Sequence, residues 1–242
     1  MLWIMRQRTA TVLESAIKEF IRFGKPVSSE LLFEKGDFGV KPATIRAELN
    51  HLTEDGFLTQ PHTSGGRVPT DRGYEFFVNQ LVNELPDRAS QTVNLLENLA
   101  DNFLEGALDD FIRDFSDQLR LLTIGYQFSE NGVYKSGLDN LFASLDLNSK
   151  ADFYEVAKDF EDIEERARKL KRFAERLNMA PAVFIGKKSP VTRSRHLAVI
   201  ADCYEIDNGS GRFLLMAVGS KRMDYKKNIA TFRALRKKLC DV

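Results

Sequence analysis

Cysteine, histidine and tryptophan are scarce in this chain of 242 residues, which has two, three and one of them. The two cysteines, Cys203 and Cys240, are far apart, and neither belongs to the closely spaced Cys/His pattern of a zinc site or a redox motif. Two thiols are also too few for the disulfide framework of a secreted domain. These absences exclude a cysteine-based metal or redox function and favour a reducing, cytoplasmic environment.

Long hydrophobic runs are also absent. No segment approaches the ~20 apolar residues that span a bilayer. The apolar start, Met1–Met5, is shorter than a signal-peptide core and is followed by Arg6 and Arg8. We therefore expect a cytoplasmic protein that makes no contact with a membrane.

The chain has no net charge, with 35 basic and 35 acidic residues, but the two signs are unevenly distributed. Residues 84–165 include nineteen acidic and six basic residues, whereas residues 219–242 include two acidic and eight basic ones. Because an acidic surface repels nucleic acid, any contact with DNA is expected on particular faces only.

Signatures of catalysis are missing from the sequence. It has no phosphate-binding GxxxxGK[ST] loop, no HExxH pair and no dinucleotide fingerprint after a predicted strand. The histidines, His51, His62 and His196, are scattered, and the acidic run at 161–165 is typical of a solvated helix face. We therefore expect neither an enzyme nor a bound metal or cofactor.

Three short helices are predicted near the N-terminus. The first, Thr9–Phe23, is followed by the glycine and proline that end helices. The second, Glu30–Glu34, follows two serines that can cap it, Ser28 and Ser29. The third runs from about 42 to 55, and its first residue is a proline, which is favoured there. This pattern predicts a helix-turn-helix unit.

A predicted hairpin follows the third helix. Phe57–Gln60 and Arg67–Pro69 have the composition of strands, and the loop 61–66 between them is polar and contains two glycines. A further helix begins at Thr70 or Asp71. A hairpin at this place is the wing of a winged helix-turn-helix, which we therefore predict as the DNA-binding domain of residues 1–80.

The third helix is predicted to have an apolar side, with Ile45, Leu49 and Leu52, and a polar side. Arg46 and Asn50 on the polar side can bind base edges bidentately. The helix N-terminus suits phosphates, and a polar wing can follow the backbone or enter the minor groove. A merely solvated polar face is the alternative. The predicted DNA-binding residues are Ser28, Lys41, Ala43, Thr44, Arg46, Asn50, His62, Thr63, Ser64 and Arg67.

Residues 81–122 are predicted to be an amphipathic helical linker of one helix or two, with apolar residues at every fourth position. Two interpretations stay open: the apolar stripe is a dimerisation element, or it packs on its own C-terminal domain. The stripe residues predicted for dimerisation are Leu95, Leu99, Phe103, Phe111 and Phe115.

The remainder, residues 123–242, is predicted to be an α+β domain. Strands are predicted at 122–128, 182–185, 197–206 and 213–218, and helices at about 137–145, 151–177 and 224–240. The last helix is basic, so it either contacts phosphates or binds the acidic helix of its own chain.

Several segments resemble the heat-inducible transcription repressor HrcA family. In the N-terminal domain these are Lys41–Leu49 in the third helix and Gly56–Asp71 across the hairpin. Three segments of the C-terminal half, Val133–Leu141, Val183–Lys187 and Gly219–Tyr225, resemble family motifs in the same order.

This resemblance implies a GAF-like C-terminal domain and an inverted-repeat DNA operator upstream of chaperone genes, bound by a homodimer. It also implies dependence on the chaperonin GroEL. The family usually has asparagine where Ala47 stands and alanine where Gly65 stands, and its region before Val133 is longer, which makes the GAF-like domain here an abbreviated one. The residues that it marks as DNA contacts are Lys41, Thr44, Arg46, His62, Thr63, Ser64 and Arg67.

Three functional hypotheses follow. The first is a sequence-specific repressor of heat-shock genes. The second is a winged-helix regulator of other genes that responds to a small ligand in its C-terminal half. The third is a protein-interaction module that has lost DNA binding. An inverted repeat upstream of the chaperonin genes would distinguish the first from the second.

Overall fold

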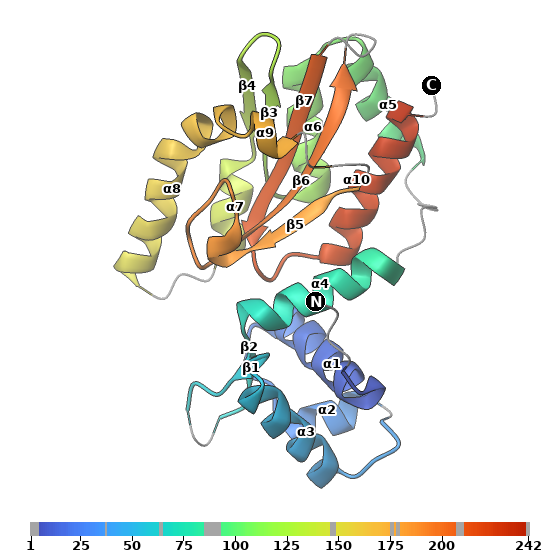
Figure 1. The fold of residues 1–242 in the computed structure, drawn as a ribbon, viewed down its shortest axis with the longest axis vertical. Helices are drawn as coiled ribbons and strands as arrows, with labels where there is room; N and C mark the ends of the chain where they lie inside the picture. The colour runs from blue at the N-terminus through green and yellow to red at the C-terminus, as the bar shows by residue number, and fades with distance from the viewer. Residues whose placement is uncertain are drawn as a thin grey trace. The chain divides into compact units, whose positions relative to one another are not determined.

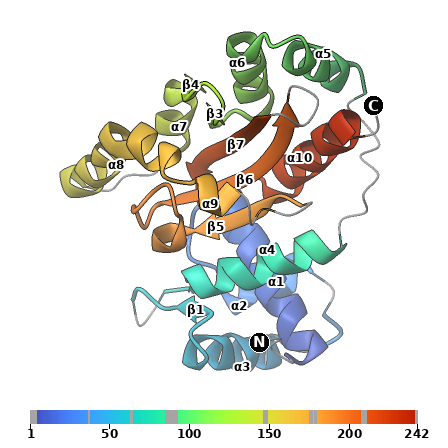
Figure 2. The ribbon, with the colours of Figure 1, turned by 45° about the horizontal axis from the view of Figure 1, so that its top comes forward.

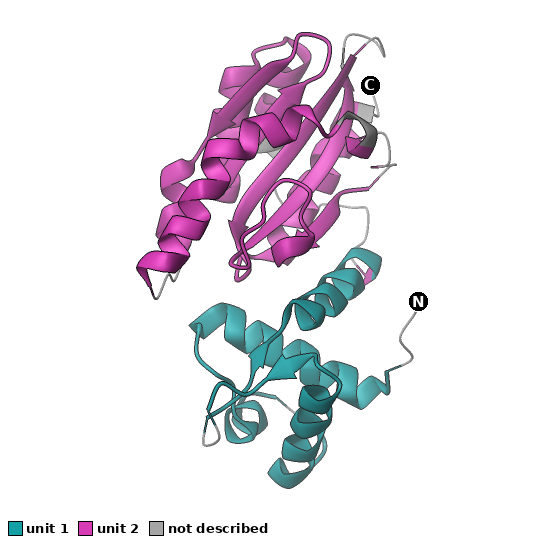
Figure 3. Cartoon of the chain, turned by 60° about the vertical axis from the view of Figure 1, so that its left-hand side comes forward, with its two compact units in different colours: residues 1–83 teal, residues 84–242 magenta. Residues whose placement is uncertain are grey.

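The computed structural model describes residues 5–36, 38–62, 65–84, 93–145, 149–174, 177, 180–206 and 211–240. The chain divides into two compact units, Met1–Asn83 and Glu84–Val242 (Figure 3). No helix among these residues is long and apolar enough to cross a membrane.

The N-terminal unit combines helices with a short antiparallel hairpin (Figure 1). Its elements occur in the predicted order, although each strand has only two residues. They are α1 (Gln7–Phe23), α2 (Ser29–Lys35), α3 (Pro42–Glu54), β1 (Leu58–Thr59), β2 (Val68–Pro69) and α4 (Asp71–Glu84).

Two predicted helix caps of this unit are confirmed, although α1 begins at Gln7 rather than Thr9 and α2 is longer than predicted. Gly24 ends α1 in the left-handed conformation, φ 66°, and its amide donates to the carbonyl oxygen of Phe20. Ser28, rather than Ser29, caps α2, and its hydroxyl oxygen accepts the amide of Leu31 at 3.2 Å. These caps end α1 and begin α2, so the two are separate helices.

The C-terminal unit is built on an antiparallel sheet with the strand order β4-β3-β7-β6-β5. Together with its helices this confirms the predicted α+β class. Its elements are α5 (Val93–Leu104), α6 (Leu108–Leu119), β3 (Leu122–Gln127), β4 (Gly132–Ser136), α7 (Leu138–Ser144), α8 (Lys150–Arg168), α9 (Lys171–Ala174), β5 (Ala182–Ile185), a 3-10 turn (Gly186–Lys188), β6 (Leu197–Ile206), β7 (Gly211–Ser220) and α10 (Tyr225–Cys240).

Helices cover both faces of this sheet (Figure 2). On one face, Ile124 of β3 belongs to a buried cluster with Leu141 of α7 and Val156 of α8. On the other face, a side chain at Gly125 would collide with Phe213 of β7 and with Ile112 of α6. The period of two along β3 thus gives each face its own core.

The described residues 93–122 of the predicted linker do not form a separate element. The described helices in this range, α5 and α6, belong to the C-terminal unit and pack against its sheet. Two other expectations also differ from the structure: the strand β4 was not predicted, and the helix expected over 151–177 is divided into α8 and α9.

Candidate nucleic-acid interface

Helix α3 has the two sides that the sequence predicts. Ile45, Leu49 and Leu52 are completely buried against the rest of the unit. Arg46 and Asn50 are exposed, as are Lys41, Ala43 and Ala47. The polar side of α3 is therefore open to a partner along its whole length.

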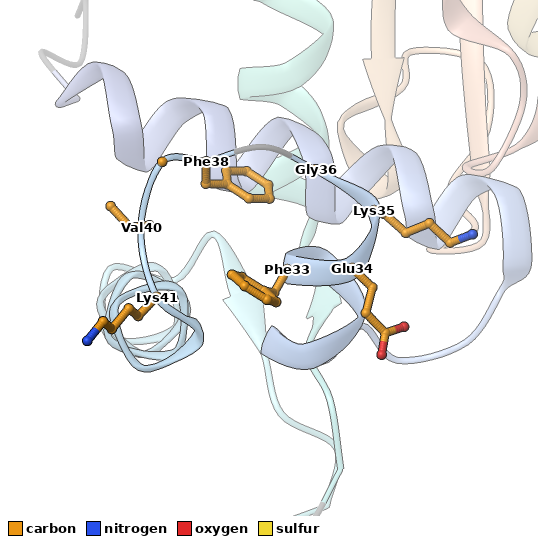
Figure 4. A pocket seen from close by; sticks show the side chains of 8 residues that line it. Phe33, Glu34, Lys35, Gly36, Phe38, Val40 and Lys41 are labelled. Atoms are coloured by element: carbon orange, nitrogen blue, oxygen red, sulfur yellow. The ribbon is translucent and has the colours of Figure 1, made fainter.

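A shallow hollow lies where α2 leads into α3 (Figure 4). The rings of Phe33 and Phe38 line it, and the ammonium group of Lys41 points away from them (Figure 4). Thr44 follows Lys41 in the first turn of α3 and is half-buried, with its amide bonded to the Lys41 carbonyl oxygen at 2.9 Å. Lys41 is therefore accessible to an anion at the start of this helix.

The base of the hairpin is fixed to the segment before α2. Val27 and Arg67 exchange two backbone hydrogen bonds, both of 2.8 Å. A Cβ atom at Gly66 would lie 2.6 Å from the carbonyl carbon and oxygen of Val27. Only glycine permits this approach, so the hairpin and the start of α2 are held together by the backbone itself.

The loop of the hairpin is partly described. His62 is exposed, and its carbonyl oxygen accepts the amide of Gly65 at 2.9 Å. The side chain of Gln60 donates to the carbonyl oxygen of Gly65 at 3.0 Å. Thr63 and Ser64, which were predicted to contact DNA, lie outside the described residues.

Arg67 connects the hairpin to α3. Its Nη2 donates to Oδ1 of Asn50 at 2.5 Å. Two residues predicted independently as DNA contacts, one on the helix and one on the hairpin, therefore lie side by side. A ligand that reached one of them would also meet the other.

Arg46 is paired with an acid from α2. Its Nη2 donates to Oε1 of Glu30 at 2.6 Å. The pKa of Glu30 is lowered to about 2 by a hydrogen bond from its own backbone, and further by the Arg46 guanidinium and the Ser28 hydroxyl. Glu30 is therefore ionised at neutral pH.

The buried acid Glu48 was missed by the sequence analysis. It lies on the apolar side of α3, where its carboxylate accepts Nε of Arg8 at 2.8 Å and the hydroxyl of Thr9 at 2.7 Å. Burial raises its pKa, but the bonds from Thr9 and Arg8 outweigh this and leave the pKa below its ordinary value. An acid on the apolar side of a predicted helix was the available signal for such a pair.

The apolar stripe predicted for dimerisation lies inside the C-terminal unit instead. Leu99, Phe103, Phe111 and Phe115 are all buried, and the ring of Phe103 packs edge-on against that of Phe213 with centroids 5.3 Å apart. The side chain of Leu95 lies outside the described residues. The ring of Phe115 packs against that of Phe232 on α10. The dimerisation prediction is therefore wrong for these four side chains, because they are buried within their own unit.

The basic helix α10 binds the acidic helices of its own unit. Nζ of Lys238 lies 3.2 Å from Oε1 of Glu97 on α5, and Nζ of Lys227 donates to the carbonyl oxygen of Gln118 on α6 at 2.8 Å. Asp224 caps α10, as its carboxylate accepts the amide of Lys227 at 3.0 Å. Of the two interpretations of this helix, the contact within the chain is the one found.

One group in the described chain has atoms close enough to hold a metal ion. Ligand atoms of Asp152, Glu155 and His196 lie within 4.8 Å of one another. However, Nη2 of Arg195 donates to Asp152 at 2.8 Å, and its backbone amide donates to Glu155 at 2.9 Å. The Arg195 bond also lowers the pKa of Asp152 to about 2. With a guanidinium among these atoms, the group fixes the segment before β6 to α8.

Comparison with known proteins identifies the family. A family model described as the HrcA protein C terminal domain matches residues 72–229. The chain belongs to the HrcA family. The match includes α4 and nearly all of the C-terminal unit, so the N-terminal hairpin and α3 lie outside it.

Curated relatives named heat-inducible transcription repressor HrcA match shorter parts of the chain. The protein of Frankia casuarinae is 41% identical over 113 residues, which are 46% of this chain and 32% of the relative. The protein of Chloroflexus aggregans is 50% identical over 78 residues, which are 32% of this chain and 21% of the relative. The matched regions thus span no more than about a third of these HrcA proteins.

One solved structure has the same fold. A crystal structure described as a hypothetical protein covers 98% of this chain and 98% of its own, with a TM-score of 0.78 and 16% identity. At this identity the similarity concerns the fold alone.

Proposed function

We propose that this HrcA family member is a transcription repressor that binds a specific DNA sequence. In this proposal the N-terminal unit is a winged helix-turn-helix, α3 enters the major groove and the hairpin is the wing. The observation that carries the proposal is the pairing of Arg67 on the hairpin with Asn50 on α3 at 2.5 Å. It joins the two elements that such a domain presents to DNA.

The chemistry of this surface supports contact with both bases and backbone. Arg46 and Asn50 have side chains that bind guanine and adenine bidentately, and Ala43 and Ala47 beside them leave room for base edges. Lys41 at the helix start and Arg67 on the hairpin are placed to neutralise phosphates on either side.

The proposal also covers the DNA operator, the oligomeric state of the protein and its regulation. From the resemblance to the HrcA family, we propose that the target is an inverted repeat upstream of chaperone genes. A two-fold operator requires a two-fold protein, so we propose a homodimer, which uses a surface other than the buried stripe. The C-terminal sheet is proposed as an abbreviated GAF-like regulatory domain through which the chaperonin GroEL acts.

The test is a fluorescence-anisotropy titration of the full chain. An inverted-repeat duplex from upstream of the host's chaperonin genes is compared with a scrambled duplex at two salt concentrations. We expect the repeat to be bound about 10³-fold more tightly or better. Equal, weak and strongly salt-dependent binding of both duplexes would contradict the proposal.

A second measurement tests the assembly. Light scattering of the free protein at micromolar concentration is expected to give the mass of a dimer. A monomer at this concentration would contradict the proposed homodimer. It would not test DNA binding, which the titration measures.

A protein-interaction module is the second candidate function. The observation that favours it is the occupation of both arginines on this surface, Arg46 by Glu30 and Arg67 by Asn50. In that case the titration shows no preference for any duplex, whereas a repressor retains one.

A further inference from the structure

The pairing of Arg46 with Glu30 calls for an explanation. Both side chains are largely exposed, at 64% for Arg46 and 57% for Glu30. Exposed ion pairs contribute little to stability, because solvent screens them and the side chains lose freedom. The pair is therefore not explained by the stability of the N-terminal unit.

A carboxylate is unfavourable on a surface that approaches DNA. Phosphates dominate the affinity of proteins for DNA, and an acid beside them repels them. Glu30 retains its charge at neutral pH, since its pKa is about 2. It therefore reduces overall affinity, unless it contributes something else to binding.

Glu30 holds the guanidinium group of Arg46 in one orientation. A guanidinium has five N–H donors in one plane, and the bond from Nη2 to Glu30 uses one of them. The remaining donors are sufficient for the two acceptors, O6 and N7, that guanine presents in the major groove. A guanidinium already held in place loses less conformational freedom when it binds.

We propose that Glu30 is a positioning residue that orients Arg46 to read one base pair, and so gives sequence specificity at the expense of overall affinity for DNA. The proposal rests on the proposed function, because it assumes that α3 enters the major groove. It adds a residue on α2, outside the predicted DNA-binding set, to the determinants of specificity.

The test uses four single variants of the full chain and one double variant, Glu30→Ala with Arg46→Ala. Glu30→Ala removes the acceptor, Glu30→Gln keeps an acceptor without the charge, and Arg46→Ala removes the proposed reader. Glu34→Ala is the matched control, because Glu34 is an exposed acid on the same helix and no ion pair to it is present in the described part of the chain. Circular dichroism at increasing temperature checks that each variant is folded.

Each protein selects from a library of randomised duplexes, and its binding to the selected and scrambled duplexes is then titrated. Glu30→Ala is expected to lower discrimination at one base pair about tenfold, and Glu30→Gln is expected to lower it by a smaller factor. Both variants are expected to bind scrambled DNA more tightly than the wild type does. Glu34→Ala is expected to raise affinity for all duplexes alike. In the Arg46→Ala background, Glu30→Ala is expected to leave discrimination unchanged.

The possible failures are distinguishable. If the wild type selects no sequence, the proposed function fails, and the role of Glu30 with it. If the wild type selects a sequence and Glu30→Ala discriminates equally well, only the positioning role is overturned. An effect of Glu30→Ala that persists without Arg46 also overturns it, since Glu30 would then act by another route.

A measurement without DNA tests the geometry directly. NMR of the arginine side chains is expected to show slow exchange of the Arg46 guanidinium protons in the wild type and in Glu34→Ala, and fast exchange in Glu30→Ala. Equally fast exchange in all three proteins would contradict the positioning role.

Discussion

At the scale of single residues, Arg46 and Arg67 of the N-terminal unit differ in their surroundings. Arg46 is bound by a charged group on another helix, whereas Arg67 is bound by the neutral amide of Asn50. Arg46 lies on the helix proposed to enter the groove, and Arg67 on the hairpin beside it. The two residues are therefore expected to affect DNA binding in different ways.

Replacing each arginine with alanine distinguishes the two effects on DNA binding. Arg46→Ala is expected to cost about 1–3 kcal/mol of specific binding and to relax the preference at one base pair. Arg67→Ala is expected to lower the affinity for all duplexes alike. It is also expected to reduce the slope of log affinity against log salt concentration by about 1. Anisotropy titrations at several salt concentrations measure both, with Arg22→Ala at the end of α1 as the control. Negligible effects of both changes would contradict the placement of the DNA surface.

Glu48 is expected to matter for folding. Glu48→Ala removes the acceptor of Arg8 and Thr9 and is expected to lower the free energy of unfolding by about 1–2 kcal/mol. Glu54→Ala, at a 75% exposed site on the same helix, is the control and is expected to change it by less than about 0.5 kcal/mol. Chemical denaturation measures both, and equal effects would contradict a special role for Glu48.

The same residue predicts a dependence on pH. Because the pKa of Glu48 is lower in the folded protein, its stabilising contribution is complete above the unfolded pKa of about 4.5. It is lost as the pH falls through the folded pKa. The difference in stability between the wild type and Glu48→Ala is therefore expected to shrink on acidification below that value.

At the scale of residues, the sequence predicts which side chains are exposed better than it predicts which side chains contact one another. The helical period places Arg46 and Asn50 outside and Ile45 inside, because 100° per residue is a local property of α3. It does not predict that Glu30 lies against Arg46, since that contact depends on how α2 packs against α3.

At the scale of elements, the hairpin and the start of α2 behave as one piece. Gly66→Ala is expected to destabilise the N-terminal unit by about 1–3 kcal/mol, because its methyl group would meet the backbone of Val27. Gly65→Ala is the control, since its methyl group would come only as near as 3.3 Å to the His62 carbonyl oxygen. Thermal unfolding of both variants measures the difference, and equal midpoints would contradict it.

Helices α5 and α6 are expected to act as core elements of the C-terminal unit. Phe111→Ala removes a fully buried ring and is expected to cost about 3–5 kcal/mol of folding stability. Leu104→Ala, at a 56% exposed site on α5, is expected to cost less than about 0.5 kcal/mol. A Phe111→Ala protein that remained equally stable and became monomeric would restore the dimerisation interpretation.

Elements with a strong apolar pattern were predicted, and those without one were missed. β6 and β7 are long and mostly buried; the predicted range 197–206 matches β6, and the predicted range 213–218 lies within β7. β4 lies at an edge of the sheet, where its side chains are mostly half-buried and no alternation marks it. The predicted helix at 151–177 continued too far because its helical pattern does not show where α8 ends, at Arg168.

At the scale of the whole molecule, the chain divides into two units with separate cores. The N-terminal unit has its own buried residues and capped helices, so residues 1–84 expressed alone are expected to unfold cooperatively. Circular dichroism during thermal denaturation measures this, and a broad loss of helix without a transition would contradict it. The proposed homodimer predicts in addition that the isolated unit binds the operator more weakly than the full chain.

The strand order of the C-terminal sheet has a consequence for synthesis of the chain. β3 pairs with β7 from Leu122↔Val218 to Gln127↔Phe213, so the centre of the sheet joins segments that leave the ribosome far apart in time. Domains generally fold as units during synthesis, N-terminal first. The N-terminal unit is thus complete while β3 still lacks β7 and exposes apolar side chains. Each newly made molecule therefore passes through a stage in which its proposed DNA-binding end is finished and its other half is still unfolded.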